Sequence, residues 1–114
     1  MTRLVSTDPG KPGKIFSSVL LATAAAADGH TETVYFIDEA VKTLQNPQEI
    51  TQGSFSPLRG ILEQANLLGV RFYACEESSG LFAVAPSAVP GFVEVVGAAR
   101  LNDLLVECDA SVSL

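Results

Sequence analysis

Residues 70–79 read Val-Arg-Phe-Tyr-Ala-Cys-Glu-Glu-Ser-Ser, so an apolar run passes abruptly into a polar one. The β-branched and aromatic side chains before Cys75 are typical of a strand, and the acidic residues after it are typical of the first turn of a helix. Open α/β sheets carry their sites at the carboxyl ends of parallel strands, and the free amides of a following helix stabilise a thiolate. Cys75 is therefore a candidate working thiol. The alternative is a buried cysteine that fills space as a small hydrophobic residue.

Apolar runs alternate with segments of helical periodicity along the whole chain, which is the pattern of βαβ units around a parallel sheet. The five predicted strands are Leu4-Val5 with its neighbours and residues 33–37, 70–74, 93–96 and 110–114. The predicted helices are one that ends at Asp28-Gly29, a brief one over 39–44, one that Ser56-Pro57 begins and Gly69 ends, a short one within 81–90, and one from Ala99 onward. The sequence thus predicts an α/β fold.

Length and composition limit the possible functions. A chain of 114 residues is about one domain, and we expect a single domain over 1–114. The net charge of −6 argues against a nucleic-acid partner, and the apolar stretch 15–27 is too short to cross a membrane. No signal peptide is recognisable, so we expect a cytoplasmic protein. The 47% hydrophobic content makes a homo-oligomer plausible.

Polar residues follow four of the predicted strands, where a parallel sheet would gather them at one edge. The candidate site residues are Thr7 and Asp8 after the first strand, Asp38 and Glu39 after the second, Cys75, Glu76, Glu77, Ser78 and Ser79 after the third, and Gly97 after the fourth. Cys75 is the only soft nucleophile among them. The hydroxyls of Ser78 and Ser79 are candidates to donate hydrogen bonds to an added sulfur or oxyanion. Nearby carboxylates favour the neutral thiol, so Glu76 and Glu77 oppose the helix amides.

Asp38 and Glu39 also have two interpretations. They are candidates to bind a cation or to act as acid and base, and the competing interpretation is that they cap the short helix after the second strand. The lysine-bearing segment 8–14 lacks the glycine and the hydroxyl residue of a phosphate-binding loop, which argues against nucleotide hydrolysis.

The remaining histidine and cysteine are not expected at this edge. His30 precedes the second strand, so it should lie at the opposite edge from Cys75, which disfavours a Cys-His dyad. Cys108 continues the apolar stripe of the last helix and is expected in the core. A single histidine makes a zinc site improbable, and nothing in the chain calls for a metal or an organic cofactor.

The runs 70–75 and 91–99, the closing helix and strand, and Tyr35-Phe36-Ile37-Asp38-Glu39 resemble the DsrE/DsrF-like family, which includes TusD-type sulfur-relay subunits. The resemblance spans nearly the whole chain. It implies a three-layer α/β/α sandwich with a five-stranded, mainly parallel sheet, and assembly as a trimer or hexamer. It also implies sulfur carried as a persulfide on Cys75 and exchanged with donor and acceptor proteins.

Two other functions compete with a sulfur carrier of the sulfurtransferase type. Some members of the family serve as noncatalytic binding or assembly subunits, in which Cys75 would be buried and unreactive. A flavodoxin-like binder of flavin or nucleotide is the third, although no residue of the chain requires it. The acidic residues 76 and 77 depart from what is expected beside an active persulfide cysteine.

Overall fold

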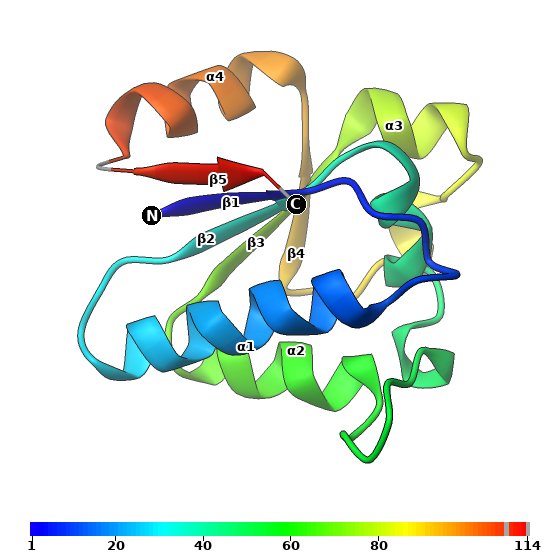
Figure 1. Ribbon diagram of the computed structural model, residues 1–114. Coiled ribbons are helices and arrows are strands. Elements are labelled where there is room, and N and C mark those ends of the chain that lie inside the picture. The colour runs from blue at the N-terminus through cyan, green and yellow to red at the C-terminus, as the bar shows by residue number, and fades with distance from the viewer. Residues whose placement is uncertain (109, 114) are drawn as a thin grey trace.

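A parallel sheet forms the centre of the computed structural model, which describes residues 1–108 and 110–113 (Figure 1). Its strands are β1 (Thr2–Val5), β2 (Thr33–Phe36), β3 (Arg71–Cys75), β4 (Val93–Val96) and β5 (Ser111–Ser113). They lie in the order β4-β3-β2-β1-β5, and every neighbouring pair is parallel. The predicted α/β fold with a parallel sheet is confirmed. The expected last strand reached Leu114, which lies outside the described residues.

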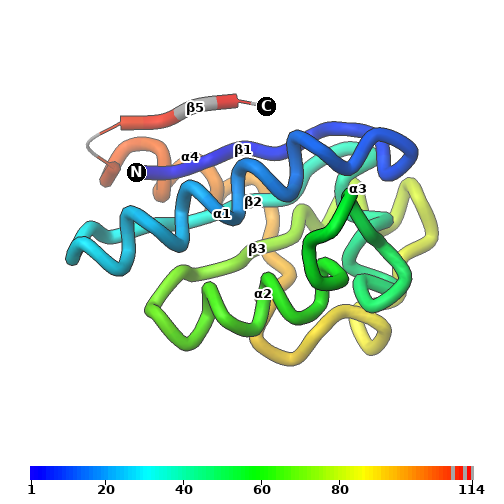
Figure 2. The backbone as a smooth tube through the Cα atoms, turned by 60° about the horizontal axis from the view of Figure 1, so that its bottom comes forward, coloured from blue at the N-terminus to red at the C-terminus, as the bar shows by residue number. Residues whose placement is uncertain are grey.

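Helices cover both faces of the sheet, so the fold has three layers (Figures 1 and 2). The α-helices are α1 (Gly13–Ala27), α2 (Leu58–Leu67), α3 (Glu76–Leu81) and α4 (Ala98–Glu107), and the 3-10 helices are η1 (Asp38–Leu44), η2 (Pro47–Glu49) and η3 (Pro86–Ala88). Helices α1 and α2 pack side by side on one face, and α4 lies on the other.

Side chains of each strand alternate between these two layers, as the period of two requires. Phe36 and Phe72 point into the cluster beneath α1 and α2, with ring centroids 6.4 Å apart. Tyr35 and Tyr73, their neighbours in sequence, point to the opposite face, where Leu104 of α4 covers them. Because Cys75 has the same parity as Tyr73, its side chain lies on the α4 face.

The connections change from one face of the sheet to the other at β4. The β3–β4 connection contributes Val84 and Val89 to the cluster of α1 and α2, whereas α4, which follows β4, packs on the opposite face. Right-handed crossovers produce this arrangement, since β1 to β4 advance in one direction and β5 returns to the far side of β1. Adjacent strands whose connections leave on opposite faces open a crevice at their carboxyl ends. In this fold that position lies between Cys75 and Gly97.

Glycine ends two of the predicted helices as expected. Gly29 follows α1 with φ +91°, and Gly69 follows α2 with φ +98°, a conformation that favours glycine. The predicted start of α2 is wrong by one position. Pro57 occupies the N-cap position, with φ −52° and ψ 152°, and no side chain caps the helix because the proline ring has no hydrogen-bond acceptor. Ser56 therefore does not cap α2.

Candidate functional site at the carboxyl edge of the sheet

Cys75 is both the last residue of β3 and the N-cap of α3. Its backbone is still extended, with φ −71° and ψ 124°, so its side chain is free to turn back over the first helical turn. The Ser78 N–H donates a hydrogen bond to Cys75 Sγ at 3.4 Å. The cysteine is half-buried, so the thiol is not enclosed in the core. A backbone amide thus contacts the sulfur, which is the interaction expected from the sequence.

A carboxylate holds the same thiol from the other side. Cys75 Sγ donates a hydrogen bond to Glu77 Oε2 at 3.3 Å. The pKa of Glu77 is lowered, first by its own backbone N–H, then by the Cys75 thiol and by the N–H of Ala98 at the start of α4. Glu77 therefore stays ionised at neutral pH and joins the ends of β3 and β4.

Tyr35 packs in the same cluster as Cys75, on the α4 face of the sheet. Its side chain is fully buried, stacks on Tyr73 with centroids 6.1 Å apart, and donates its hydroxyl to the Val96 carbonyl at 3.1 Å. Burial raises the pKa of Tyr35 to about 12, and the nearby Cys75 and Glu77 side chains add to the effect. The phenol is therefore protonated at neutral pH, and it fixes the end of β4 beside Cys75.

Ser78 and Ser79 are buried and brace the turn after Cys75. Ser78 Oγ accepts the Asp38 N–H at 2.9 Å, and Ser79 Oγ donates to the Cys75 carbonyl oxygen at 2.8 Å. In this structure the Ser79 hydroxyl proton is therefore engaged by the Cys75 carbonyl. The group of residue 78 that contacts the sulfur is its backbone amide.

Asp8 and Glu39 come together next to this turn, from the loops after β1 and β2. The Gly10 N–H donates to Asp8 Oδ1 at 2.7 Å. This bond, a hydrogen bond with the Glu39 side chain, and the positive charges of Lys42 and Lys11 lower the pKa of Asp8. The exposed Asp8 and the half-buried Glu39 form an acidic pair, and the nearby lysines offset its negative charge.

Asp38 links the acidic pair to the cysteine through its backbone. It precedes Glu39, has φ +51°, and donates its N–H to Ser78. Asp38 and Glu39 lie in the first turn of η1. The N-cap position of this helix is Ile37, and no side chain forms a capping hydrogen bond. Thr7 is half-buried and Glu76 is exposed, and no hydrogen bond joins either of them to Cys75 in the described part of the chain.

His30 and Cys108 lie at the opposite, amino edge of the sheet, where both line one cavity. The expected separation of His30 from Cys75 is therefore found. The prediction that Cys108 is a core residue is wrong. Helix α4 ends at Glu107, so Cys108 adopts an extended conformation, is half-buried, and donates its thiol to the Leu105 carbonyl at 3.2 Å.

Tyr35 and the amide of Ala98 were not among the residues predicted for the site. The strand parity that puts Tyr35, Tyr73 and Cys75 on one face was readable from the sequence. The strand order that brings β4 against β3 was not, and Ala98 depends on it. No group of three metal-binding side chains occurs within residues 1–108 and 110–113. None of the helices there has the length and hydropathy needed to span a bilayer.

The fold and the site define a small α/β protein with a half-buried thiol at the carboxyl end of a central parallel strand. The chain belongs to the DsrE/DsrF-like family, whose model matches residues 1–114. No curated protein matches the sequence. The expected family membership is confirmed.

Solved structures share the fold over nearly the whole chain. The YchN protein from E. coli superposes with a TM-score of 0.81 at 16% identity, covering 99% of this chain and 97% of that one. MTH1491 from Methanobacterium thermoautotrophicum gives 0.69 at 19% identity, with 99% and 96% covered. BT1422 from Bacteroides thetaiotaomicron gives 0.73 at 15% identity, with 99% and 93% covered. These likenesses establish the architecture.

Proposed function

We propose that the protein is a small sulfur carrier that accepts sulfane sulfur as a persulfide on Cys75 and passes it to a partner thiol. Membership of the DsrE/DsrF-like family supports a role in sulfur relay. The observation that carries the proposal is the half-buried Cys75 at the N-cap of α3, with the Ser78 N–H 3.4 Å from its sulfur. A thiol that is partly exposed and contacted by a backbone amide has the environment of a reactive cysteine.

The transfer is a thiol exchange without net oxidation. The Cys75 thiolate attacks the outer sulfur of a donor persulfide, the Cys75–sulfur bond forms, the donor sulfur–sulfur bond breaks, and the donor leaves as a thiolate. In discharge, an acceptor thiolate attacks the outer sulfur and releases the Cys75 thiolate. Each step moves one sulfur atom and leaves the number of thiols and persulfides unchanged. No metal or organic cofactor takes part.

The residues around Cys75 have separate roles in this proposal. The Ser78 amide stabilises negative charge on sulfur, and Glu77 accepts the hydrogen bond of the resting thiol. Tyr35 and Ser79 fix the ends of β4 and β3 around it. Thr7, Asp8, Asp38, Glu39 and Glu76 belong to the surrounding rim, where a partner protein would contact the site.

The partners follow from the same chemistry. A carrier needs one protein that supplies sulfane sulfur and one that accepts it, and we place both in the cytoplasm with the carrier. A homo-oligomer, a trimer or hexamer, is part of the proposal. The support on this chain is a set of apolar side chains that are more than half exposed, Leu21, Phe55, Leu67, Leu81 and Val106.

Alkylation kinetics test whether Cys75 is the reactive thiol. The chain offers a matched control, because Cys75 and Cys108 are both half-buried and both donate a hydrogen bond to an oxygen. Cys108→Ser and Cys75→Ser each leave one thiol, and iodoacetamide carries no charge. We expect Cys75 in the folded protein to react several-fold faster than Cys108 at neutral pH. If Cys75 reacts no faster, a noncatalytic binding or assembly subunit becomes the better account.

A further inference from the structure

A second site candidate lies at the amino edge of the sheet, far from Cys75 along the strands. A cavity of about 680 Å³ opens there between the carboxyl-terminal half of α4, the loop that leads into β2, and the first residues of the strands. Its volume is within the range of small-molecule sites. The proposed sulfur transfer uses no residue of this cavity.

The floor of the cavity is a polar row across the sheet. Thr2, Thr33 and Arg71 are direct register partners on β1, β2 and β3, so their side chains stand next to one another on the α4 face. Further along the same face the equivalent row is Leu4, Tyr35 and Tyr73, which α4 covers. Thr2 and Thr33 are both at most 6% exposed, so their hydroxyls lie at the bottom of the cavity.

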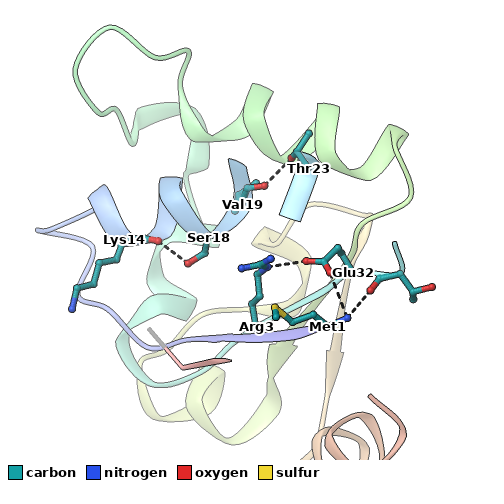
Figure 3. A network of polar contacts seen from close by, with 8 residues as sticks. Met1, Arg3, Lys14, Ser18, Val19, Thr23 and Glu32 are labelled. Carbon is teal, nitrogen blue, oxygen red and sulfur yellow. Dashed lines mark hydrogen bonds and ion pairs between the residues drawn. The ribbon is translucent and has the colours of Figure 1, made fainter. Parts of the chain in front are cut away.

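The charge of the cavity is positive, although the chain carries −6 overall. Glu32 is 2% exposed and is neutralised by Arg3 at 2.8 Å and by the N-terminal amine of Met1 at 3.4 Å (Figure 3). The other charged side chains that line the cavity are Arg71 and Arg100, with Glu107 as the one opposing carboxylate among the described residues.

Arg100 is positioned at the cavity by an aromatic ring. Its guanidinium carbon lies 5.8 Å from the centroid of the Tyr73 ring. Neither Arg100 nor Arg71 forms an ion pair with a carboxylate within residues 1–108 and 110–113. A hydrogen bond with the Tyr73 side chain, and more weakly the charges of Glu107 and Asp103, raise the pKa of Arg100. A guanidinium that is held in place and forms no direct ion pair is suited to bind a planar carboxylate or a phosphate. Leu104 and Ala25 provide apolar walls beside it.

We propose that this cavity binds a small organic anion, with its carboxylate or phosphate between Arg71 and Arg100 on the Thr2–Thr33 row and its apolar part against Leu104. The basis is the joint placement of two guanidinium groups, two hydroxyls and an apolar wall in one concave site. The site is separate from the carboxyl-edge thiol, so its test does not depend on sulfur chemistry.

The test is a titration of the full chain, followed by amide chemical shifts, at constant ionic strength and pH 7. The probes are benzoate and phenyl phosphate, which differ in their anionic group, and phenol, which has the same ring without the charge. We expect saturable shifts at residues 30–33, 71 and 104–108 with at least one of the anions and none with phenol.

Three variants sharpen the result. Arg71→Gln and Arg100→Gln should each weaken the anion by about tenfold or more, and Glu107→Gln should tighten it by about threefold. Arg59→Gln is the matched control, because Arg59 lies on α2 and pairs with Glu63 at 2.6 Å. The affinity of Arg59→Gln for the anion should equal that of the unmodified chain. Equal binding of phenol, equal loss in Arg59→Gln, or no saturable shift with either anion would overturn the proposal.

Discussion

Cys75 Sγ lies 3.3 Å from Glu77 Oε2, and Glu77 is held in turn by the Ala98 N–H at the start of the neighbouring α4. The thiol is therefore paired with an ionised carboxylate on one side and with the Ser78 amide on the other. The two contacts have opposite effects on the thiolate, since the amide stabilises it and the carboxylate destabilises it. Reactivity at this site should depend on their balance.

Replacing Glu77 by glutamine should raise the alkylation rate of Cys75 about three- to tenfold at neutral pH. The substitution removes the charge near the sulfur and keeps an amide oxygen that still accepts the Ala98 N–H. Glu76→Gln, one residue away and exposed, is the control and should change the rate little. The measurement is the pseudo-first-order reaction with iodoacetamide in a Cys108→Ser background. An unchanged or slower rate in Glu77→Gln would show that the carboxylate does not restrain the thiol.

Tyr35→Phe should destabilise the fold by about 1 kcal/mol, because the half-buried Val96 carbonyl loses its hydroxyl partner. Urea unfolding measures the effect. Tyr73→Phe is the comparison, since Tyr73 is buried in the same cluster but lies next to Arg100. Equal stability of Tyr35→Phe and the unmodified protein would mean that the hydroxyl contributes nothing to holding β4.

The difference in stability between the unmodified protein and Tyr35→Phe should depend on pH. The pKa of Tyr35 is about 12 in the folded protein against 10.0 for an ordinary tyrosine. The unfolded chain therefore loses this proton first, and the unmodified protein loses stability as the pH rises from 10 to 12. Tyr35→Phe lacks that loss, so its deficit should shrink over this interval. Other titrating groups are common to both proteins and cancel in the difference. A deficit that stays constant or grows between pH 10 and 12 would contradict the raised pKa.

Arg3→Gln should destabilise the protein by about 2–4 kcal/mol, because it leaves the buried Glu32 carboxylate with only the more distant amine of Met1 (Figure 3). The double variant Arg3→Leu with Glu32→Leu should recover most of that loss, since replacing a buried ion pair by apolar residues is often neutral. A double-mutant cycle in urea measures the coupling. Additive effects of the two changes would show that the ion pair is not coupled in the folded state.

Among residues 1–108 and 110–113, two residues other than glycine have a left-handed backbone, Asp38 with φ +51° and Ala83 with φ +55°. Glycine at either position should remove strain, and the gain should be larger at Ala83, at about 1 kcal/mol, because aspartate tolerates this region better than alanine. Thermal unfolding of Ala83→Gly and Asp38→Gly gives the order. A larger gain at Asp38, or destabilisation at Ala83, would contradict it.

The strands were predictable because apolar runs with β-branched residues give a strong local signal, and β4 was predicted with its observed bounds. The prediction was wrong at two helix ends, the start of α2 and the end of α4, which the apolar pattern does not determine. Pro57 rather than Ser56 occupies the N-cap position of α2, because proline sets the backbone at the entry of that helix. Cys108 follows the apolar period of α4, but the helix stops one residue earlier and leaves it at a cavity.

The sequence predicts that the candidate site lies at the carboxyl edge of the sheet, but it does not predict which groups form hydrogen bonds there. Any parallel sheet gathers Cys75, Asp38 and Asp8 at its carboxyl edge, so those positions follow from the strand pattern alone. The contact of Glu77 with Ala98 depends on β4 lying next to β3, which local sequence does not specify. The hydroxyls of Ser78 and Ser79 serve the backbone because they are buried, and burial is a tertiary property.

Mass spectrometry of the sulfur-loaded protein tests the central claim most directly. The reduced protein is exposed to polysulfide, thiosulfate or a loaded cysteine desulfurase, and its peptides are mapped with Cys75→Ser and Cys108→Ser measured alongside. The account predicts one added sulfur on Cys75, present in Cys108→Ser, absent from Cys75→Ser, and removed by an acceptor thiol. No adduct on a demonstrably reduced Cys75 from any donor, or an adduct on Cys108 alone, would contradict the account.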